Sequence, residues 1–150
     1  MLIRWLLAAL HLLALGIGLG AVWARGSALR GRLDADGYRR LFHADSLWGV
    51  AALLWISTGL VRAFGGLEKG SAYYLHNAAF LAKMTLLVLV LALEVWPMTT
   101  LIRWRVALGR GREVDPGPAA TLALISRVQA GLIVAMVFAA TAMARGLAAL

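Results

Sequence analysis

Apolar residues fall into four long runs along the chain, and short polar stretches rich in arginine separate these runs. A helix that crosses the hydrocarbon core of a bilayer needs roughly 20 apolar residues. We therefore predict four membrane-spanning helices, at about 5–24, 47–64, 75–102 and 121–144. These helices and their loops use the whole chain, so we expect an all-α fold, an integral membrane four-helix bundle that forms a single transmembrane domain over residues 1–150.

Composition and charge fit a membrane protein better than a nucleic-acid-binding one. The chain is 62% hydrophobic with a formal net charge of +8, and its mean hydropathy is +0.81. The arginines flank the apolar runs, and the pattern leaves no soluble element that could carry a basic face. We therefore expect the lipid bilayer as partner and no nucleic acid. The absence of cysteine excludes disulfides, iron–sulfur clusters and thiolate zinc sites.

The distribution of Lys and Arg predicts the orientation of the chain in the membrane. Residues 25–46 contain five of these cations and residues 103–120 contain four, whereas the N-terminal flank, the 65–74 connector and the C-terminal tail contain one each. Loops rich in Lys and Arg stay on the cytoplasmic side. We therefore predict a multi-pass protein of the bacterial inner membrane with both termini outside, in the periplasm.

A few ionisable residues interrupt the apolar runs. A charged side chain in hydrocarbon costs several kcal/mol, so each needs a partner or a task. At about 1.5 Å per residue, His11 lies roughly 9 Å and Lys83 roughly 12 Å below the outer surface. At 100° per residue, the ionisable groups of the third helix share one stripe, within about 20°. The residues in question are His11, Lys83, Glu94 and Arg127 within the runs, and Arg62 and His76 nearer an interface.

Together these positions suggest a pocket in the outer half of the bundle that would suit heme b. His11 and Lys83 would be metal ligands on facing helices, Arg62 would meet a propionate at the membrane edge, and His76 is a further cofactor-binding candidate. Gly18 would leave a recess beside the imidazole. His11 has an equally good structural interpretation, because a lone histidine in a membrane helix often hydrogen-bonds to a backbone carbonyl.

Other residues have simpler interpretations. We predict that Glu94 and Arg127 form a buried ion pair between the third and fourth helices, which could also relay protons from the inner side. Asp45 is expected to cap the second helix. Small residues, Gly16 with Gly20 and the ladder beginning at Gly131, are expected to allow close helix packing.

Parts of the sequence resemble the small four-helix bacterial protoporphyrinogen oxidase family. The similar segments are Ala9-Leu10-His11-Leu12-Leu13, Arg25 at the end of the first helix, and Lys83 followed by a leucine-rich run to Glu94 and then Arg103 and Arg105. The resemblance implies heme b associated with His11 and Lys83. That family usually has histidine where Glu94 stands. Over its whole length, including residues 47–52 and 65–70, the chain resembles more closely a family of predicted bacterial membrane proteins of unknown function.

Three functions compete on this basis. The first is a heme-b membrane redox protein, which transfers electrons or oxidises a tetrapyrrole. The second is a small carrier or permease-like protein, which would have to form a homo-oligomer because four helices make a small transporter. The third is a non-catalytic accessory subunit of a larger membrane complex, in which the buried charges only fix the helix register. Whether the protein is an enzyme is left open by the sequence.

Overall fold

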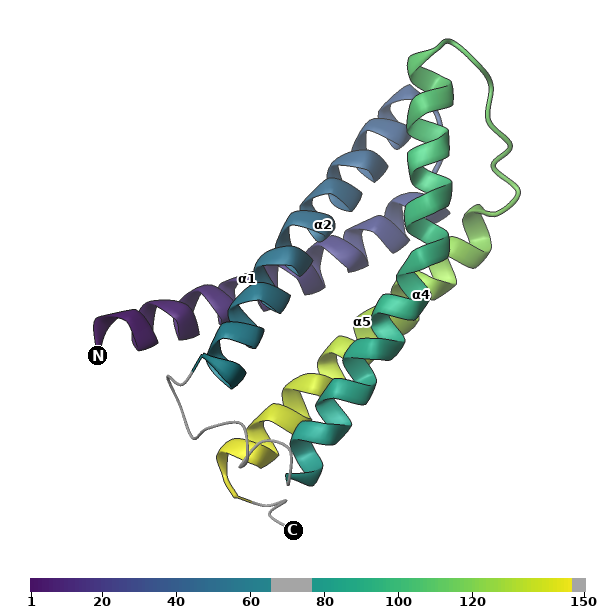
Figure 1. Cartoon of the computed structure of the whole chain (residues 1–150). Helices are drawn as coiled ribbons and strands as arrows, with labels where there is room; N and C mark the ends of the chain where they lie inside the picture. Colours follow the sequence, from purple (N-terminus) through teal and green to yellow (C-terminus); the bar gives the residue numbers. More distant parts are fainter. Residues whose placement is uncertain (66–76, 147–150) are drawn as a thin grey trace.

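The computed structural model describes residues 1–65 and 77–146, and these residues form four long α-helices (Figure 1). Each helix is long and apolar enough to cross a membrane, which confirms the prediction of an all-α membrane fold. The helices are α1 (Leu2–Arg30), α2 (Ala35–Phe64), α4 (Ala78–Gly109) and α5 (Ala119–Ala144).

The second helix begins well before the predicted start near residue 47. Asp34 is its N-cap, and the Asp34 carboxylate accepts a hydrogen bond of 2.9 Å from the backbone N–H of Gly37. This is the favoured role of an aspartate at a helix start, because it satisfies one of the unpaired N–H groups of the first turn. The predicted cap role of Asp45 is therefore wrong: Asp45 lies inside α2.

The other helix boundaries differ most at the arginine-rich end of the bundle. Helix α1 continues to Arg30 and α4 continues to Gly109, past the predicted ends near residues 24 and 102. The extension of α1 places Arg25 inside a helix instead of in a loop. At the other end of the bundle, Asn77 caps α4 by accepting a hydrogen bond from the N–H of Phe80.

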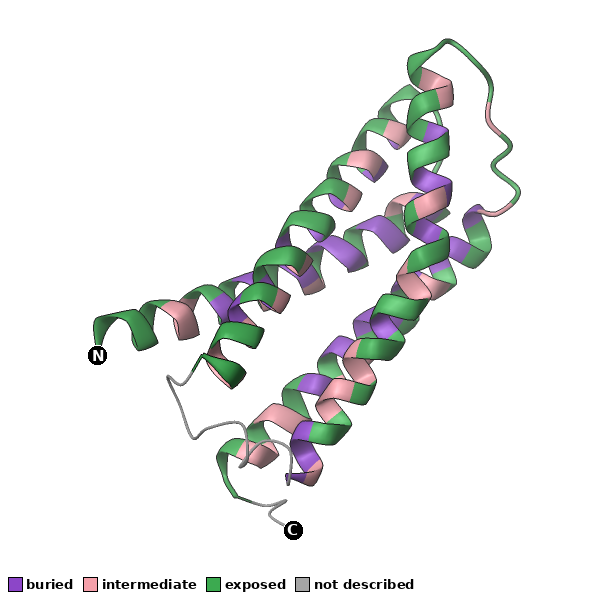
Figure 2. Cartoon of the chain, viewed as in Figure 1, coloured by how far each residue is buried: buried purple, intermediate pink, exposed green. Residues whose placement is uncertain are grey.

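The helices pack as two antiparallel pairs that diverge toward one end. Helix α1 contacts α2 and α5, and α4 contacts α5. In Figure 1 the α1/α2 pair spreads away from the α4/α5 pair toward the end where the N-terminus, the last turn of α2 and the first turn of α4 lie. Buried positions face between the helices, whereas the outward faces are exposed (Figure 2). Exposed apolar side chains such as Leu53 and Phe138 fit contact with lipid.

Two apolar layers make up the core, and a polar level separates them. The layer nearer the termini includes Val22, Trp55 and Ile133, and the layer at the arginine-rich end includes Leu41 and Leu101. In each helix the residues of the polar level lie between those of the two layers along the sequence. They are Arg25 in α1, Asp45 in α2, Glu94 in α4, and Ser126 with Gln129 in α5.

The glycines that allow close packing are not the predicted ones. A Cβ added at Gly16, Gly20 or Gly131 would meet nothing within 4 Å. These three glycines therefore do not bring helices of this chain together, contrary to the prediction. Close approach occurs instead at Gly26, where a Cβ would lie 3.1 Å from Ser126 of α5.

Candidate functional site

A cavity of about 530 Å³ lies near the diverging end of the bundle, and residues of all four helices line it. It contains His11 from α1, Arg62 from α2 and Lys83 from α4. The structure thus brings together three of the four residues that the sequence assigns to cofactor binding. The fourth, His76, lies outside the described residues.

The imidazole of His11 is held by the last turns of α2. His11 is 7% exposed, and its Nδ1 lies 3.0 Å from both the carbonyl oxygen of Trp55 and Oγ1 of Thr58. A carbonyl can only accept a hydrogen bond, and the Thr58 hydroxyl donates to the carbonyl of Leu54 at 2.6 Å. Nδ1 must therefore carry the proton, which assigns the lone pair of the neutral ring to Nε2.

A close approach of α2 makes this arrangement possible. A Cβ added at Gly59 would lie 3.0 Å from Cε1 of His11. A Cβ added at Gly18, which we expected beside the imidazole, would instead lie 3.2 Å from the ring of Trp48. The predicted recess is therefore on the wrong helix: the glycine next to the imidazole belongs to α2. The indole of Trp55 adds a ring contact, with its centroid 6.1 Å from that of His11.

Among the residues that the structure describes, the charged side chains that line the cavity are Arg62 and Lys83, and both are basic. Arg62 and Lys83 are half-buried, and the lining contains no Asp or Glu among the described residues. Trp55 also lines the cavity, and its Nε1–H is buried without an acceptor among residues 1–65 and 77–146. A buried donor without a partner costs free energy. The unsatisfied donor of Trp55 favours a ligand that has a hydrogen-bond acceptor.

A second set of polar groups surrounds Arg25, whose side chain is fully buried. Its Nη1 and Nη2 donate to the two carboxylate oxygens of Glu94 at 2.7 and 2.8 Å, and Nη1 also donates to Asp45 at 3.1 Å. The remaining donors go to Ser126 at 3.1 Å and to the side-chain oxygen of Gln129 at 2.8 Å. All five guanidinium N–H groups are thus used, so the group is fully satisfied in the middle of the bundle.

The Arg25 network continues toward the arginine-rich end. Nη2 of Arg105 lies 3.4 Å from the second carboxylate oxygen of Asp45, and the Arg105 side chain is 45% exposed. Arg25 and Arg105 thereby match the two negative charges of Asp45 and Glu94. The network joins all four helices, and its charges cancel only when Arg105 is included.

The predicted ion pair between Glu94 and Arg127 is wrong, because Glu94 binds Arg25 instead. Arg127 is exposed, and its guanidinium lies 5.7 Å from the ring centroid of Trp23, a cation–π contact. Sequence reasoning missed Arg25 because the first helix was expected to end near residue 24. The signal was present: the face of α1 that contains His11, Gly18 and Val22 reaches Arg25 at the next helical step.

Within the described residues, no three His, Cys, Asp or Glu side chains lie together as a metal-ion site. An iron held in a macrocycle needs only one or two axial ligands from the protein. A heme site would therefore not be recognised as a group of three such side chains.

Comparison with known proteins gives one family. A family model described as "Predicted membrane protein (DUF2214)" matches residues 3–148. No curated protein and no solved structure matches the chain. The match agrees with the closer of the two resemblances noted in the sequence and covers nearly all of the chain.

Proposed function

This chain belongs to the DUF2214 family of predicted membrane proteins, and we propose that it is a membrane redox protein that binds heme b in the cavity near its termini. The observation that supports the proposal is the meeting of His11, Lys83 and Arg62 from three helices around one cavity of about 530 Å³. Ligand pockets of this kind are mostly apolar with a few polar groups that fix orientation.

The chemistry of the donors fits a heme. Because Nδ1 of His11 donates to Trp55 and Thr58, a metal in the cavity would be bound through Nε2. A histidine that binds a metal usually donates a hydrogen bond from its other ring nitrogen, often to a backbone carbonyl, and this bond fixes both the tautomer and the ring orientation. Lys83 is the proposed second ligand, and Arg62 the proposed partner of a propionate.

A bound heme would supply one-electron redox chemistry, with a potential set by its axial ligands and by burial. The protein would hold the imidazole, exclude water with the surrounding apolar side chains, and neutralise the propionates. A proton relay through Glu94 and Arg127 was expected from the sequence. The relay stays a prediction for Glu94. Glu94 lies two helical turns along α4 from Leu87, a residue that lines the cavity, in the direction of the arginine-rich end. Arg127, exposed and stacked on Trp23, offers less support for it.

Titration of heme into the purified protein tests this proposal. We expect saturation near one heme per chain and a large loss of affinity in His11→Ala. The matched control is His43→Ala, because His43 is exposed and does not line the cavity. Equal heme binding by wild type, His11→Ala and His43→Ala would remove His11 from the proposed role.

A second function, a carrier for an anionic amphiphile, is favoured by one observation. The charged groups of the cavity lining, Arg62 and Lys83, are both cationic, which suits a carboxylate or phosphate on an apolar molecule. Uptake of such a molecule into liposomes without heme, lost in Lys83→Gln, would support this function over the redox one. The same variant would be compared with Arg127→Gln, which removes an exposed cation outside the cavity.

A further inference from the structure

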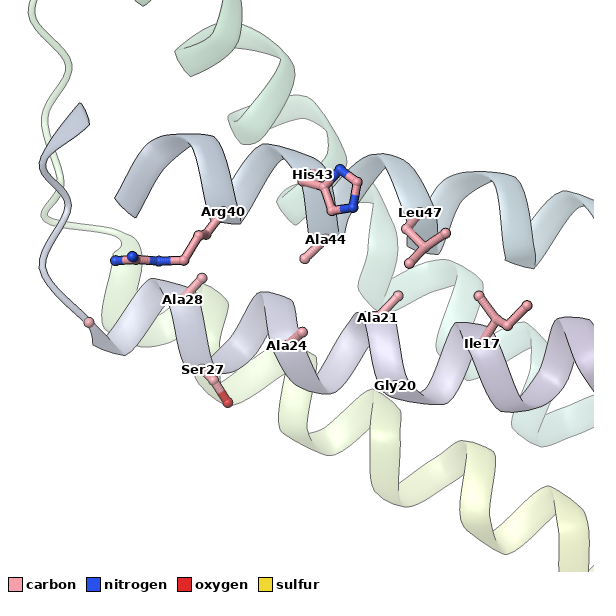
Figure 3. A pocket seen from close by; sticks show the side chains of 11 residues that line it. Ile17, Gly20, Ala21, Ala24, Ser27, Ala28, Arg40, His43, Ala44 and Leu47 are labelled. Carbon is pink, nitrogen blue, oxygen red and sulfur yellow. The ribbon is translucent and has the colours of Figure 1, made fainter. Parts of the chain in front are cut away.

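A second hollow, of about 710 Å³, lies between α1 and α2, and most of the residues that line it are exposed. Its α1 side consists mainly of small residues, among them Gly20, Ala24 and Ala28. Their short side chains leave open space above the backbone of α1. Its α2 side contains Arg40, His43 and Leu47 (Figure 3). We call this hollow the α1/α2 groove. It shares none of its lining residues with the cavity that contains His11.

The groove is polar at one end and apolar along the rest of its length. In Figure 3 Arg40 lies beside Ala28 near the arginine-rich end of α1, His43 follows, and Leu47 and Ile17 lie further toward the middle of the helices. This order follows from the sequence, because positions 40, 43 and 47 share one face of a helix. A phospholipid has the same order, with a charged headgroup at the membrane surface and an acyl chain in the hydrocarbon.

The two basic side chains are available to a ligand. Arg40 and His43 are exposed, and neither makes a hydrogen bond or an ion pair with another residue of the described ranges 1–65 and 77–146. The neighbouring Arg39, in contrast, pairs with Asp36 at 3.2 Å. Basic pockets between membrane helices on the side where arginine is concentrated attract anionic lipid headgroups.

From this charge complementarity we propose that the α1/α2 groove binds one anionic phospholipid from the leaflet at the arginine-rich end. Arg40 and His43 hold the phosphate, and one acyl chain lies over Gly20 and Ala24. The apolar length of the groove distinguishes this occupant from free phosphate, which would use the basic end alone.

Two glycines of α1 allow a test of the proposal that an acyl chain lies in the groove. A Cβ at Gly20 meets no protein atom within 4 Å, and Gly20 lines the groove, so the side chain of Gly20→Leu begins in open space at the groove surface. Gly16 has the same open surroundings but does not line the groove. Gly16→Leu is therefore the matched control, since it adds the same side chain to the same helix.

The experiment is native mass spectrometry of the full chain released from nanodiscs of phosphatidylcholine with increasing phosphatidylglycerol. We expect one retained phosphatidylglycerol on wild type and on Gly16→Leu, and loss of it in Gly20→Leu. Arg40→Gln should lower the affinity about fivefold, and an excess of glycerol phosphate should not displace the lipid. Equal retention by all variants would overturn the proposal, as would equal losses in Gly16→Leu and Gly20→Leu. Displacement of the lipid by glycerol phosphate would overturn its acyl-chain part.

Discussion

At the scale of single residues, Arg25 is a fully buried charge inside the bundle. Its charge is compensated by Asp45 and Glu94, and all its donors are satisfied. Removal of one partner of a buried ion pair typically costs about 3–5 kcal/mol, because the other charge stays buried without compensation. Lysine cannot replace arginine here. The planar guanidinium donates two parallel hydrogen bonds to the two oxygens of one carboxylate, and the ammonium group of lysine cannot do this.

We therefore predict that Arg25→Lys and Arg25→Leu both lower the thermal stability of the detergent-solubilised protein, Arg25→Leu the more strongly. Arg127→Leu serves as the control, because Arg127 is exposed and contacts the face of Trp23. We expect its effect to be about 1 kcal/mol or less. A melting curve of Arg25→Leu equal to that of Arg127→Leu would contradict the role given to the network.

Sequence reasoning at this scale predicted that His11, Lys83 and Arg62 share one pocket, because ionisable residues stand out against apolar runs and their depths can be compared. In the structure all three line one cavity. It assigned the wrong partner to Glu94. A run of about 20 apolar residues was taken as the whole first helix, which placed Arg25 in a loop. The partner of a buried charge depends on how helices rotate against each other, and a single sequence contains little information about that rotation.

At the scale of helices, the contact between α1 and α2 positions the imidazole. A Cβ at Gly59 would lie 3.0 Å from Cε1 of His11, whereas a Cβ at Gly49 of the same helix would meet nothing within 4 Å. Replacing glycine by alanine in a helix favours the helix by up to about 1 kcal/mol. At Gly59 the added methyl group must displace the imidazole by a few tenths of an ångström.

This difference predicts opposite outcomes for two substitutions of the same kind. Gly49→Ala should raise the melting temperature slightly and leave heme affinity unchanged. Gly59→Ala should lower heme affinity, because it disturbs the hydrogen bonds from Nδ1 to Trp55 and Thr58. Heme titration of the two variants side by side checks the prediction, and identical affinities would show that this helix contact does not position His11.

The helices themselves were predicted well in number and type, and less well in length. The fourth helix agrees within two residues, since apolar residues begin directly after the Pro118 turn. The sequence predicts a short amphipathic segment capped by Asp34 and a separate span that begins near residue 47, because Asp36, Arg39 and Arg40 interrupt the apolar pattern. In the structure the two form one helix. In the structure this charged segment is helical and lies at the arginine-rich end, where polar side chains can meet water and lipid headgroups.

At the scale of the whole molecule, the Arg25 network joins the four helices at one level, and the cavity lies on one side of it. Apolar residues such as Val22, Val90 and Ile133 separate the two. The chain belongs to a family of predicted membrane proteins, and its described residues form four helices long and apolar enough to cross a membrane. The orientation of the chain rests on its charge distribution alone and stays a prediction.

Cysteine labelling tests the predicted orientation, because the chain has no cysteine of its own. Glu113 and Arg145 are both exposed and lie at opposite ends of the bundle. With both termini outside, a membrane-impermeant maleimide should label Arg145→Cys in intact spheroplasts and label Glu113→Cys only after lysis. The reverse labelling pattern would show that the arginine-rich end faces outward.

The most direct test of the cavity as a heme site is an absorption spectrum of the detergent-purified protein, oxidised and then reduced with dithionite. The cells would be supplied with a heme precursor, so that cofactor supply does not limit the result. We predict a Soret band with sharp reduced α and β bands in wild type and His43→Ala, and their loss in His11→Ala. A featureless spectrum from folded wild-type protein would contradict heme binding and leave an anionic amphiphile as the ligand to test.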